Sequence, residues 1–233
     1  DNFRHLFTIR HGTGDRHEIV DGIYVGSAAS LDVASLRSLR DASSSAPPLA
    51  VVSCAAPSEI PLTAAAEAAG VDVYTFEMED ACEAKPEVQE PLERAADFVA
   101  SLRDEGRPVL VCCRMGMSRS VSVVAAYMIK HEHWTLRGAM TMIRTARPVA
   151  YPNLGFWHHL RALEMRELGG ACSVPEGALT FHRGRNGAYR QFTSMMGPPD
   201  ATTSGVAGTM AGAGRAASTA STPADAWPTP SRR

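Results

Sequence analysis

The sequence has no long hydrophobic run and no marked excess of charge of either sign. Hydrophobic residues make up 45% of its 233 positions, but no run reaches the roughly 18–20 apolar residues needed to cross a bilayer. The 25 acidic and 23 basic side chains give a formal net charge of −2 at pH 7. We therefore expect neither a membrane partner nor a nucleic-acid partner.

Cysteine is scarce and irregularly spaced. The five cysteines form no C-x-x-C pair and no Cys/His zinc pattern, so their spacing predicts no zinc site. Cys112 and Cys113 are neighbours, and adjacent side chains of a strand point to opposite faces, which would strain a bridge between them. Thiols without a disulfide framework favour a reducing compartment, the cytosol or the nucleus.

Short apolar runs alternate with segments that have helical periodicity. The first segment, 17–30, predicts a strand or hairpin, and continuous apolar runs predict buried strands at 49–54, 71–76 and 108–112. This alternation predicts an α/β fold, with a mostly parallel central sheet and helices on both faces. The predicted helices cover residues 31–42, 59–70, 91–106, 120–132, 135–147 and 155–168.

Composition divides the chain into three parts. Residues 17–168 contain all the predicted elements and form one domain, preceded by an N-terminal arm at 1–16. Residues 169–233 become rich in Ala, Gly, Ser, Thr and Pro towards their end. Such a segment cannot bury enough apolar surface to offset the entropy of ordering it, so we expect a disordered tail, within which residues 171–198 stay ambiguous.

The stretch VLVCCRMGMSRS, residues 109–120, places a loop between a buried strand and a helix. A loop that enters a helix N-terminus directs backbone N–H groups and a positive dipole at one point, which suits a phosphate group. A cysteine at the start of the loop ionises readily there, and an arginine can bind two phosphate oxygens. Cys113 and Arg119 have this C-x5-R relation, Gly116 lets the backbone curl, and Cys112 would end the strand facing away from the loop.

This stretch resembles the HC-x5-R-[ST] signature of the protein tyrosine phosphatase superfamily, and its SRS ending resembles the dual-specificity phosphatases. Two other segments resemble that family as well, DGIYVGSAAS at 21–30 and RPVAYPNLGFWHHLRALE at 147–164. The resemblance covers roughly residues 19–165. The loop CRMGMSRS is also similar to the CKMGVSRS of slingshot-type members.

The resemblance implies a protein-tyrosine-phosphatase-like fold and a two-step mechanism that needs no metal or cofactor. Cys113 attacks phosphorus to form a thiophosphate intermediate, and the hydroxyl of Ser120 assists its hydrolysis. Arg119 and the loop amides stabilise the charge of the transition state. The residues expected to bind the phosphoryl group are Arg114, Met115, Gly116, Met117, Ser118 and Arg119.

The family places an aspartate that acts as general acid about thirty residues before the cysteine. Asp80, in the acidic segment 77–86, matches this position after the predicted strand 71–76. Glu79 and Glu83 lie nearby and remain competing candidates.

The chain departs from the family pattern at Cys112, where the family has histidine. That histidine supports the loop and helps keep the thiol ionised, and a thiol is a weaker donor and acceptor. We expect Cys113 to ionise less readily and turnover to be slower than in the relatives. A separate hypothesis is that Cys54 or Cys82 protects an oxidised Cys113 as a disulfide.

The expected substrate is a phosphoprotein carrying phosphotyrosine, phosphoserine or phosphothreonine, with a protein kinase as a family-level candidate. Two alternatives stay open: a phosphate-binding scaffold with weak catalysis, and a phosphatase of phosphoinositides, RNA 5′-phosphates or glycans. The tripeptide RHG around His11 matches the histidine phosphatases, but the order of elements fits the cysteine phosphatases. The sequence leaves the oligomeric state open.

Overall fold

The computed structural model describes residues 15–42, 47–60, 62–81, 85–174, 181–183 and 189–191. The chain divides into two compact units, and the first contains every described residue from 15 to 174. Within the described residues, no helix combines the length and the apolar character that crossing a membrane requires.

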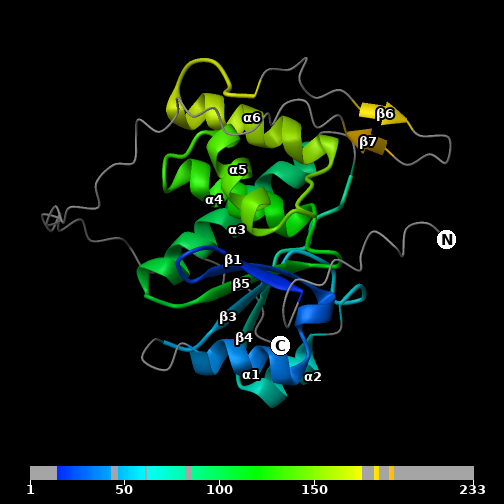
Figure 1. The fold of residues 1–233 in the computed structure, drawn as a ribbon, viewed down its shortest axis with the longest axis vertical. Helices are drawn as coiled ribbons and strands as arrows, with labels where there is room; N and C mark the ends of the chain where they lie inside the picture. The colour runs from blue at the N-terminus through cyan, green and yellow to red at the C-terminus, as the bar shows by residue number, and fades with distance from the viewer. Residues whose placement is uncertain are drawn as a thin grey trace, which may run out of the picture. The chain divides into compact units, whose positions relative to one another are not determined.

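The first unit is built on a five-stranded sheet with the order β1-β2-β5-β3-β4 (Figure 1). Only the β1–β2 pair is antiparallel, while β5 pairs in parallel with both β2 and β3, and β3 in parallel with β4. The prediction of a mostly parallel sheet is confirmed, and β5 lies at its centre. The strands are β1 (Arg16–Val20), β2 (Ile23–Ser27), β3 (Ala50–Ser53), β4 (Asp72–Thr75) and β5 (Val109–Cys113).

Helices cover both faces of the sheet, as the alternating sequence pattern predicts (Figure 1). Two lie on one face and four on the other, where the nearly fully buried α4 contacts the other three. The pair on the first face is α1 (Val33–Ala42) and α2 (Thr63–Ala69); the second face carries α3 (Pro86–Asp104), α4 (Arg119–Lys130), α5 (Leu136–Ala146) and α6 (Leu154–Leu168).

Helix α3 begins at Pro86, five residues before the start predicted at Pro91. Pro86 occupies the first turn, where its missing N–H costs nothing because that group would have no helical partner. The sequence prediction took Pro91 as the first helical residue, but it lies inside the helix. The use of Pro91 as the signal for the helix start therefore placed this boundary five residues too late.

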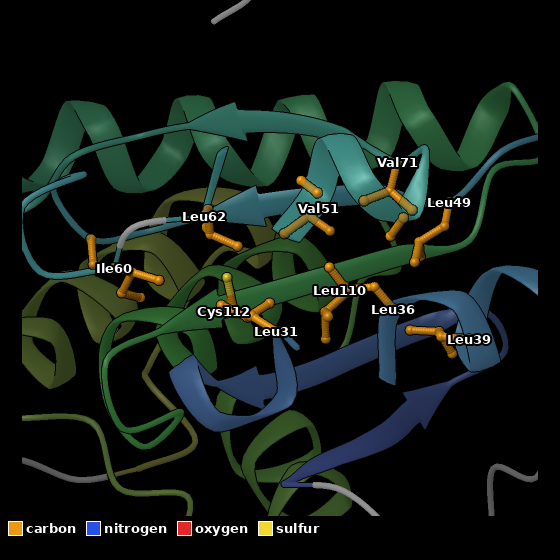
Figure 2. Close-up of a cluster of buried hydrophobic side chains, with 13 residues drawn as sticks. Leu31, Leu36, Leu39, Leu49, Val51, Ile60, Leu62, Val71, Leu110 and Cys112 are labelled. Atoms are coloured by element: carbon orange, nitrogen blue, oxygen red, sulfur yellow. The ribbon is translucent and has the colours of Figure 1, made fainter. Parts of the chain in front are cut away.

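One apolar cluster fills the space between the sheet and helices α1 and α2 (Figure 2). Leu36 of α1, Val51 of β3 and Leu110 of β5 are fully buried there, and Cys112 lies in the same cluster. Alternation along β5 sends Val111 and Cys113 to the other face. Strand β5 therefore presents its two adjacent cysteines to different surroundings.

The described chain continues past the domain boundary predicted at residue 168. Glu164 of α6 accepts hydrogen bonds from Cys172 Sγ at 2.8 Å and from the backbone N–H of Ser173 at 3.0 Å, and Arg161 Nε donates to the carbonyl of Val174 at 2.9 Å. These contacts fasten residues 172–174 to α6. The domain limits themselves remain predictions.

Two short antiparallel strands, β6 (Phe181–Arg183) and β7 (Tyr189–Gln191), lie within the segment predicted to be disordered. Composition did not predict them. The rest of the predicted tail after residue 191, and the predicted N-terminal arm up to residue 14, lie outside the described residues.

Leu36→Ala should destabilise the fold by about 2–5 kcal/mol, because the buried side chain leaves a cavity under α1. Urea denaturation followed by circular dichroism would measure the change. Met142→Ala, at a partly exposed position of α5, is the control and should shift the free energy of unfolding by less than about 1 kcal/mol. Equal effects of the two substitutions would contradict the assigned core.

Candidate active site

The candidate site lies at the carboxyl end of β5, where the chain turns through residues 114–118 into α4. Strand β5 is flanked in parallel by β2 and β3, and ligands of such sheets bind beyond the carboxyl ends of the strands. Cys113, predicted to be the first loop residue, is instead the last residue of β5, because it pairs with Ser27 of β2. Cys112 is therefore not the last strand residue.

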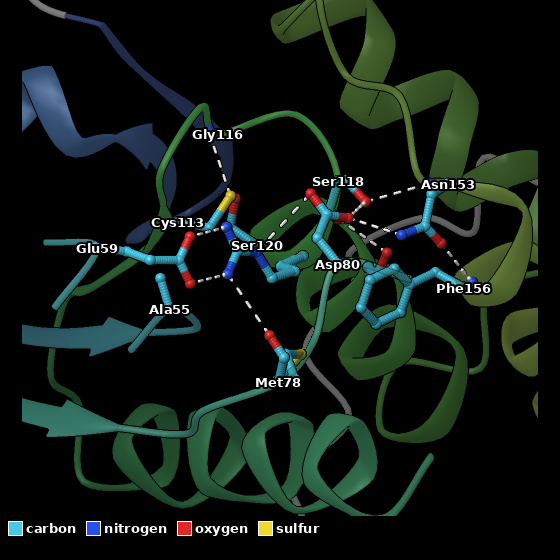
Figure 3. Close-up of polar contacts among 12 residues, drawn as sticks. Ala55, Glu59, Met78, Asp80, Cys113, Gly116, Ser118, Ser120, Asn153 and Phe156 are labelled. Atoms are coloured by element: carbon cyan, nitrogen blue, oxygen red, sulfur yellow. Dashed lines mark hydrogen bonds and ion pairs between the residues drawn. The ribbon is translucent and has the colours of Figure 1, made fainter. Parts of the chain in front are cut away.

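Two hydrogen-bonding groups lie next to the sulfur of Cys113 (Figure 3). The backbone N–H of Gly116 donates to Sγ at 3.2 Å, and Ser120 Oγ lies 3.2 Å from it. Gly116 has a φ of +64°, the left-handed conformation in which a side chain is strained. The structure thus brings Cys113, Gly116 and Ser120 together, as the spacing of the loop predicts.

The carbonyl groups of the loop are all bonded to groups outside it. Because the C=O and N–H of a trans peptide point in opposite directions, the amides that follow these carbonyls turn towards the inside of the loop. The donors are Ala28 N–H to Arg114 O at 3.2 Å, Arg147 to Met115 O at 3.3 Å and to Gly116 O at 2.6 Å, Tyr151 N–H to Met117 O at 2.6 Å, and Ser122 N–H to Ser118 O at 2.8 Å.

Arg147 supports the loop from outside and is fully buried. Besides the two loop carbonyls, its guanidinium contacts Asp15 Oδ1 at 3.1 Å and His17 Nδ1 at 2.8 Å. An added Cβ at Gly116 would lie 2.6 Å from both Arg147 Nη2 and Gly26 O. Arg147 therefore fixes the loop against β1, and only glycine fits at the point of closest approach.

Arg119, the first residue of α4, is 4% exposed and forms a two-fold ion pair with Glu59. Nη1 and Nη2 donate to the two oxygens of Glu59 at 2.7 and 2.8 Å, and Nη1 also lies 3.5 Å from the carbonyl of Met78. Burial alone would lower the pKa of Arg119, but the hydrogen bonds to Glu59 raise it overall, and they hold the pKa of Glu59 below its ordinary value. The guanidinium is therefore a fixed positive charge.

The structure brings Asp80 to the loop. Its Oδ1 accepts from Ser118 Oγ at 2.7 Å and from Asn153 Nδ2 at 2.6 Å, while Oδ2 lies 3.9 Å from Arg119 Nε. The competing Glu79 pairs with Lys85 at 2.8 Å, and Glu83 lies outside the described residues. The geometry therefore favours Asp80 over Glu79.

Asn153 joins three parts of the site. The side-chain oxygen of Asn153 caps α6 by accepting from Phe156 N–H at 2.9 Å. The backbone N–H of Asn153 donates to Ser118 Oγ at 3.1 Å. Together with the bond to Asp80, these contacts link the loop after β4, the loop after β5 and the start of α6. Among the loop residues 114–118, the side chains of Arg114 and Met115 are exposed.

The other cysteines have different environments. Cys112 is buried in the apolar cluster on the α1 and α2 face, and burial raises the pKa of its thiol. Cys54, just after β3, is a buried free thiol whose pKa is raised by burial and by the neighbouring Cys113 and Cys112. Cys82 lies outside the described residues, so the hypothesis of a disulfide to Cys113 stays a prediction. His11, in the RHG tripeptide, also lies outside them.

Three residues that contact the site were not predicted as functional: Glu59, Arg147 and Asn153. Arg147 and Asn153 lie within the segment 147–164 that resembles the family, so the signal was present without a role attached. Glu59 had no signal, because it meets Arg119 across sixty residues of sequence. Among the described residues, no group of three or more His, Cys, Asp or Glu side chains could hold a metal ion.

Comparison with known proteins gives a consistent result. A family model described as the catalytic domain of dual specificity phosphatases matches residues 50–166. The chain is 48% identical over 69 residues to mouse dual specificity phosphatase 28, and 42% identical over 72 residues to dual specificity protein phosphatase 1 of Arabidopsis thaliana. These matches cover 30% and 31% of this chain, and 42% and 36% of the relatives, so the chain spans less than half the length of either.

Solved structures extend the similarity to about two thirds of the chain. A mouse putative dual specificity phosphatase complexed with zinc tungstate has a TM-score of 0.55 and 25% identity, with 69% of this chain and 93% of that chain covered. Human DUSP28 has a TM-score of 0.52 and 27% identity, with 66% and 96% covered.

Arg147→Met should destabilise the protein by about 3 kcal/mol, because two loop carbonyls and Asp15 lose a buried charged donor. Chemical denaturation would measure this loss, and alkylation of Cys113 at fixed pH would report the altered loop. Arg144→Met, three residues earlier in the last turn of α5 and only partly buried, is the matched control and should change stability by less than about 1 kcal/mol. An Arg147→Met protein as stable as the parent would show that the loop keeps its conformation without the hydrogen bonds from Arg147.

Proposed function

Because this chain belongs to the dual specificity phosphatase family, we propose that it hydrolyses phosphotyrosine and phosphoserine or phosphothreonine in proteins through a cysteinyl-phosphate intermediate. The observation that carries the proposal is the position of Cys113 Sγ. It lies within 3.2 Å of both an inward-facing amide and Ser120 Oγ, in a loop that Asp80 and Arg119 adjoin.

In the first step, the inward-facing amides of the loop bind the oxygens of the phosphoryl group, together with the edge of the Arg119 guanidinium that Glu59 does not occupy. The thiolate of Cys113 attacks phosphorus, a sulfur–phosphorus bond forms, and the bond to the leaving oxygen breaks. The leaving oxygen takes a proton from Asp80. Since Oδ1 accepts two hydrogen bonds, Oδ2 is the oxygen that carries this proton.

In the second step, water attacks the phosphorus and releases inorganic phosphate. Asp80, now a carboxylate, accepts a proton from that water and regains its starting form. The hydroxyl of Ser120, 3.2 Å from Cys113 Sγ, donates a hydrogen bond to the departing sulfur and stabilises the returning thiolate. The four catalytic residues Cys113, Arg119, Asp80 and Ser120 thus each serve in one or both steps.

The charges around the loop favour a phosphorylated protein over a polyanionic lipid. Glu59, Glu79 and Asp80 lie on the loops that flank the phosphate site, and Arg114 is the exposed cation of the phosphate loop itself. Among residues 114–118, Arg114 is the single cationic side chain, so the loop offers little positive charge to additional phosphate groups beside the reacting one. A protein kinase is one candidate within this class, and the need for a reduced Cys113 is consistent with a cytosolic or nuclear location.

The full chain should hydrolyse p-nitrophenyl phosphate in the presence of a metal chelator, and Cys113→Ser should lower kcat at least about a thousandfold. The reason is that serine at this position is not ionised at neutral pH. Cys172→Ser, which removes a thiol held by Glu164 on α6, is the control and should keep the parent rate. A Cys113→Ser protein with parental kcat would refute the mechanism.

Phosphopeptides then test the substrate class. Release of phosphate from both phosphotyrosine and phosphothreonine peptides is the expected result. Tight phosphopeptide binding without hydrolysis would favour the scaffold alternative, and hydrolysis confined to phosphoinositides, RNA 5′-phosphates or phosphoglycans would replace the protein substrate.

Asn153→Ala should reduce kcat about tenfold for a phenyl phosphate with a poor leaving group, and less for p-nitrophenyl phosphate, because only the poor leaving group depends strongly on the acid. The side-chain amide of Asn153 donates to Asp80 Oδ1 at 2.6 Å and so fixes the position of this carboxyl group. Asn153→Ser keeps a helix cap but cannot reach Asp80, so it separates this effect from the loss of the cap. Rates that fall equally for both esters, or do not fall, would contradict the positioning of the acid by Asn153.

A further inference from the structure

Glu59 lies on a turn that the core fixes in place. The turn follows β3, and the N–H groups of Glu59 and Ile60 both bond to the carbonyl of Ala56, at 2.9 and 3.2 Å. Ile60 is buried in the apolar cluster under α1 and α2 (Figure 2). The carboxylate of Glu59 accepts hydrogen bonds from Arg119 at the start of α4, and Figure 3 draws them as dashed lines that end at Glu59.

The hydrogen bonds of Arg119 are unevenly distributed. A guanidinium has five N–H donors, and Glu59 and Met78 O take those at one end of the group, on Nη1 and Nη2. Nε is buried and has no hydrogen-bond partner within the described part of the chain. A buried N–H without a partner is unfavourable, so its position is explained if a ligand oxygen accepts a hydrogen bond from it.

The unpartnered Nε lies on the side of the site where the chemistry would occur. Its nearest carboxylate oxygen is Asp80 Oδ2, at 3.9 Å, which is too long for a hydrogen bond. The edge formed by Nε and the second hydrogen of Nη2 matches two oxygens of a phosphoryl group. Glu59 therefore occupies one edge of the guanidinium and leaves the adjacent edge open.

We propose that Glu59 is a positioning residue of this site, which holds the guanidinium of Arg119 so that its Nε edge faces the phosphoryl group. The inference rests on the proposed function, because it assigns a task within the same reaction. Glu59 also balances the charge of a buried cation while no phosphate is bound. It acts through Arg119 and touches neither the substrate nor the reacting atoms.

An opposite role would follow if Glu59 occupied the place of the phosphate itself. Its carboxylate would then have to leave before substrate bound, and removing it would strengthen phosphate binding. Because the ion pair uses the Nη1–Nη2 end and leaves Nε open, the structure favours positioning. The two roles predict changes of opposite sign.

Steady-state kinetics and inhibition by orthovanadate, which adopts the five-coordinate geometry of the transition state, test the proposal on the full chain. Glu59→Ala should lower kcat/KM about 10- to 100-fold and raise the inhibition constant of orthovanadate by a similar factor, because a misplaced guanidinium loses its contacts with the transition state. Glu59→Gln keeps one acceptor oxygen and should show a smaller change in both.

The matched control is Asp72→Asn. Asp72 is the first residue of β4, at the end of the strand away from the site. Its Oδ2 lies 2.6 Å from Nη2 of the buried Arg107. This variant should lower the melting temperature but leave kcat/KM and orthovanadate inhibition within about twofold of the parent. It therefore reports what loss of an arginine–carboxylate pair does by structural weakening alone.

The outcomes separate this inference from the proposed function. An active parent whose Glu59→Ala variant keeps parental kinetics, or binds orthovanadate more tightly, overturns the positioning role alone. Equal kinetic losses in Glu59→Ala and Asp72→Asn overturn it as well. A parent that hydrolyses no phosphate ester refutes the proposed function, and orthovanadate binding measured by calorimetry for parent and Glu59→Ala then still decides the role of Glu59.

Discussion

The site depends on the way in which the surrounding scaffold binds the carbonyl groups of the phosphate loop. Residues from the turn after β2, from α4, and from the segment that joins α5 to α6 engage the loop carbonyls from Arg114 to Ser118. The amides are left to face inward, where one already donates to Cys113. An anion site is thereby formed before any ligand arrives, so little reorganisation is needed on binding.

The side chains around this loop come from separate elements but share hydrogen bonds. Ser118 Oγ donates to Asp80 and accepts from Asn153, so the acid, the loop and the start of α6 hold one another in register. A second link, between Glu59 and Arg119, connects the turn after β3 with α4. The catalytic groups are thus fixed by residues from several elements, in pairs of groups that satisfy one another.

Local sequence patterns predicted the order of elements, because apolar runs and helical periodicity are set by near neighbours. The C-x5-R spacing predicted the relation of Cys113 to Arg119, and the resemblance supplied Ser120 and Asp80. The partners of the site were not predictable in the same way: Glu59 reaches Arg119 over sixty residues, and Arg147 reaches Gly116 over thirty-one. Such contacts follow from tertiary packing: the resemblance marked the segment that contains Arg147 but gave this residue no role, and the sequence around Glu59 does not differ from that of an ordinary surface charge.

The pleat of β5 places two consecutive cysteines on opposite faces of the sheet, in different chemical environments. Cys112 lies among aliphatic side chains with a raised thiol pKa, and Cys113 lies among hydrogen-bond donors on the opposite face. An electrophile that enters the phosphate site therefore meets one sulfur and is shielded from the other by the sheet itself. A covalent probe designed for this protein can rely on backbone geometry, rather than on differences in reagent reactivity, to select a single atom from a vicinal pair.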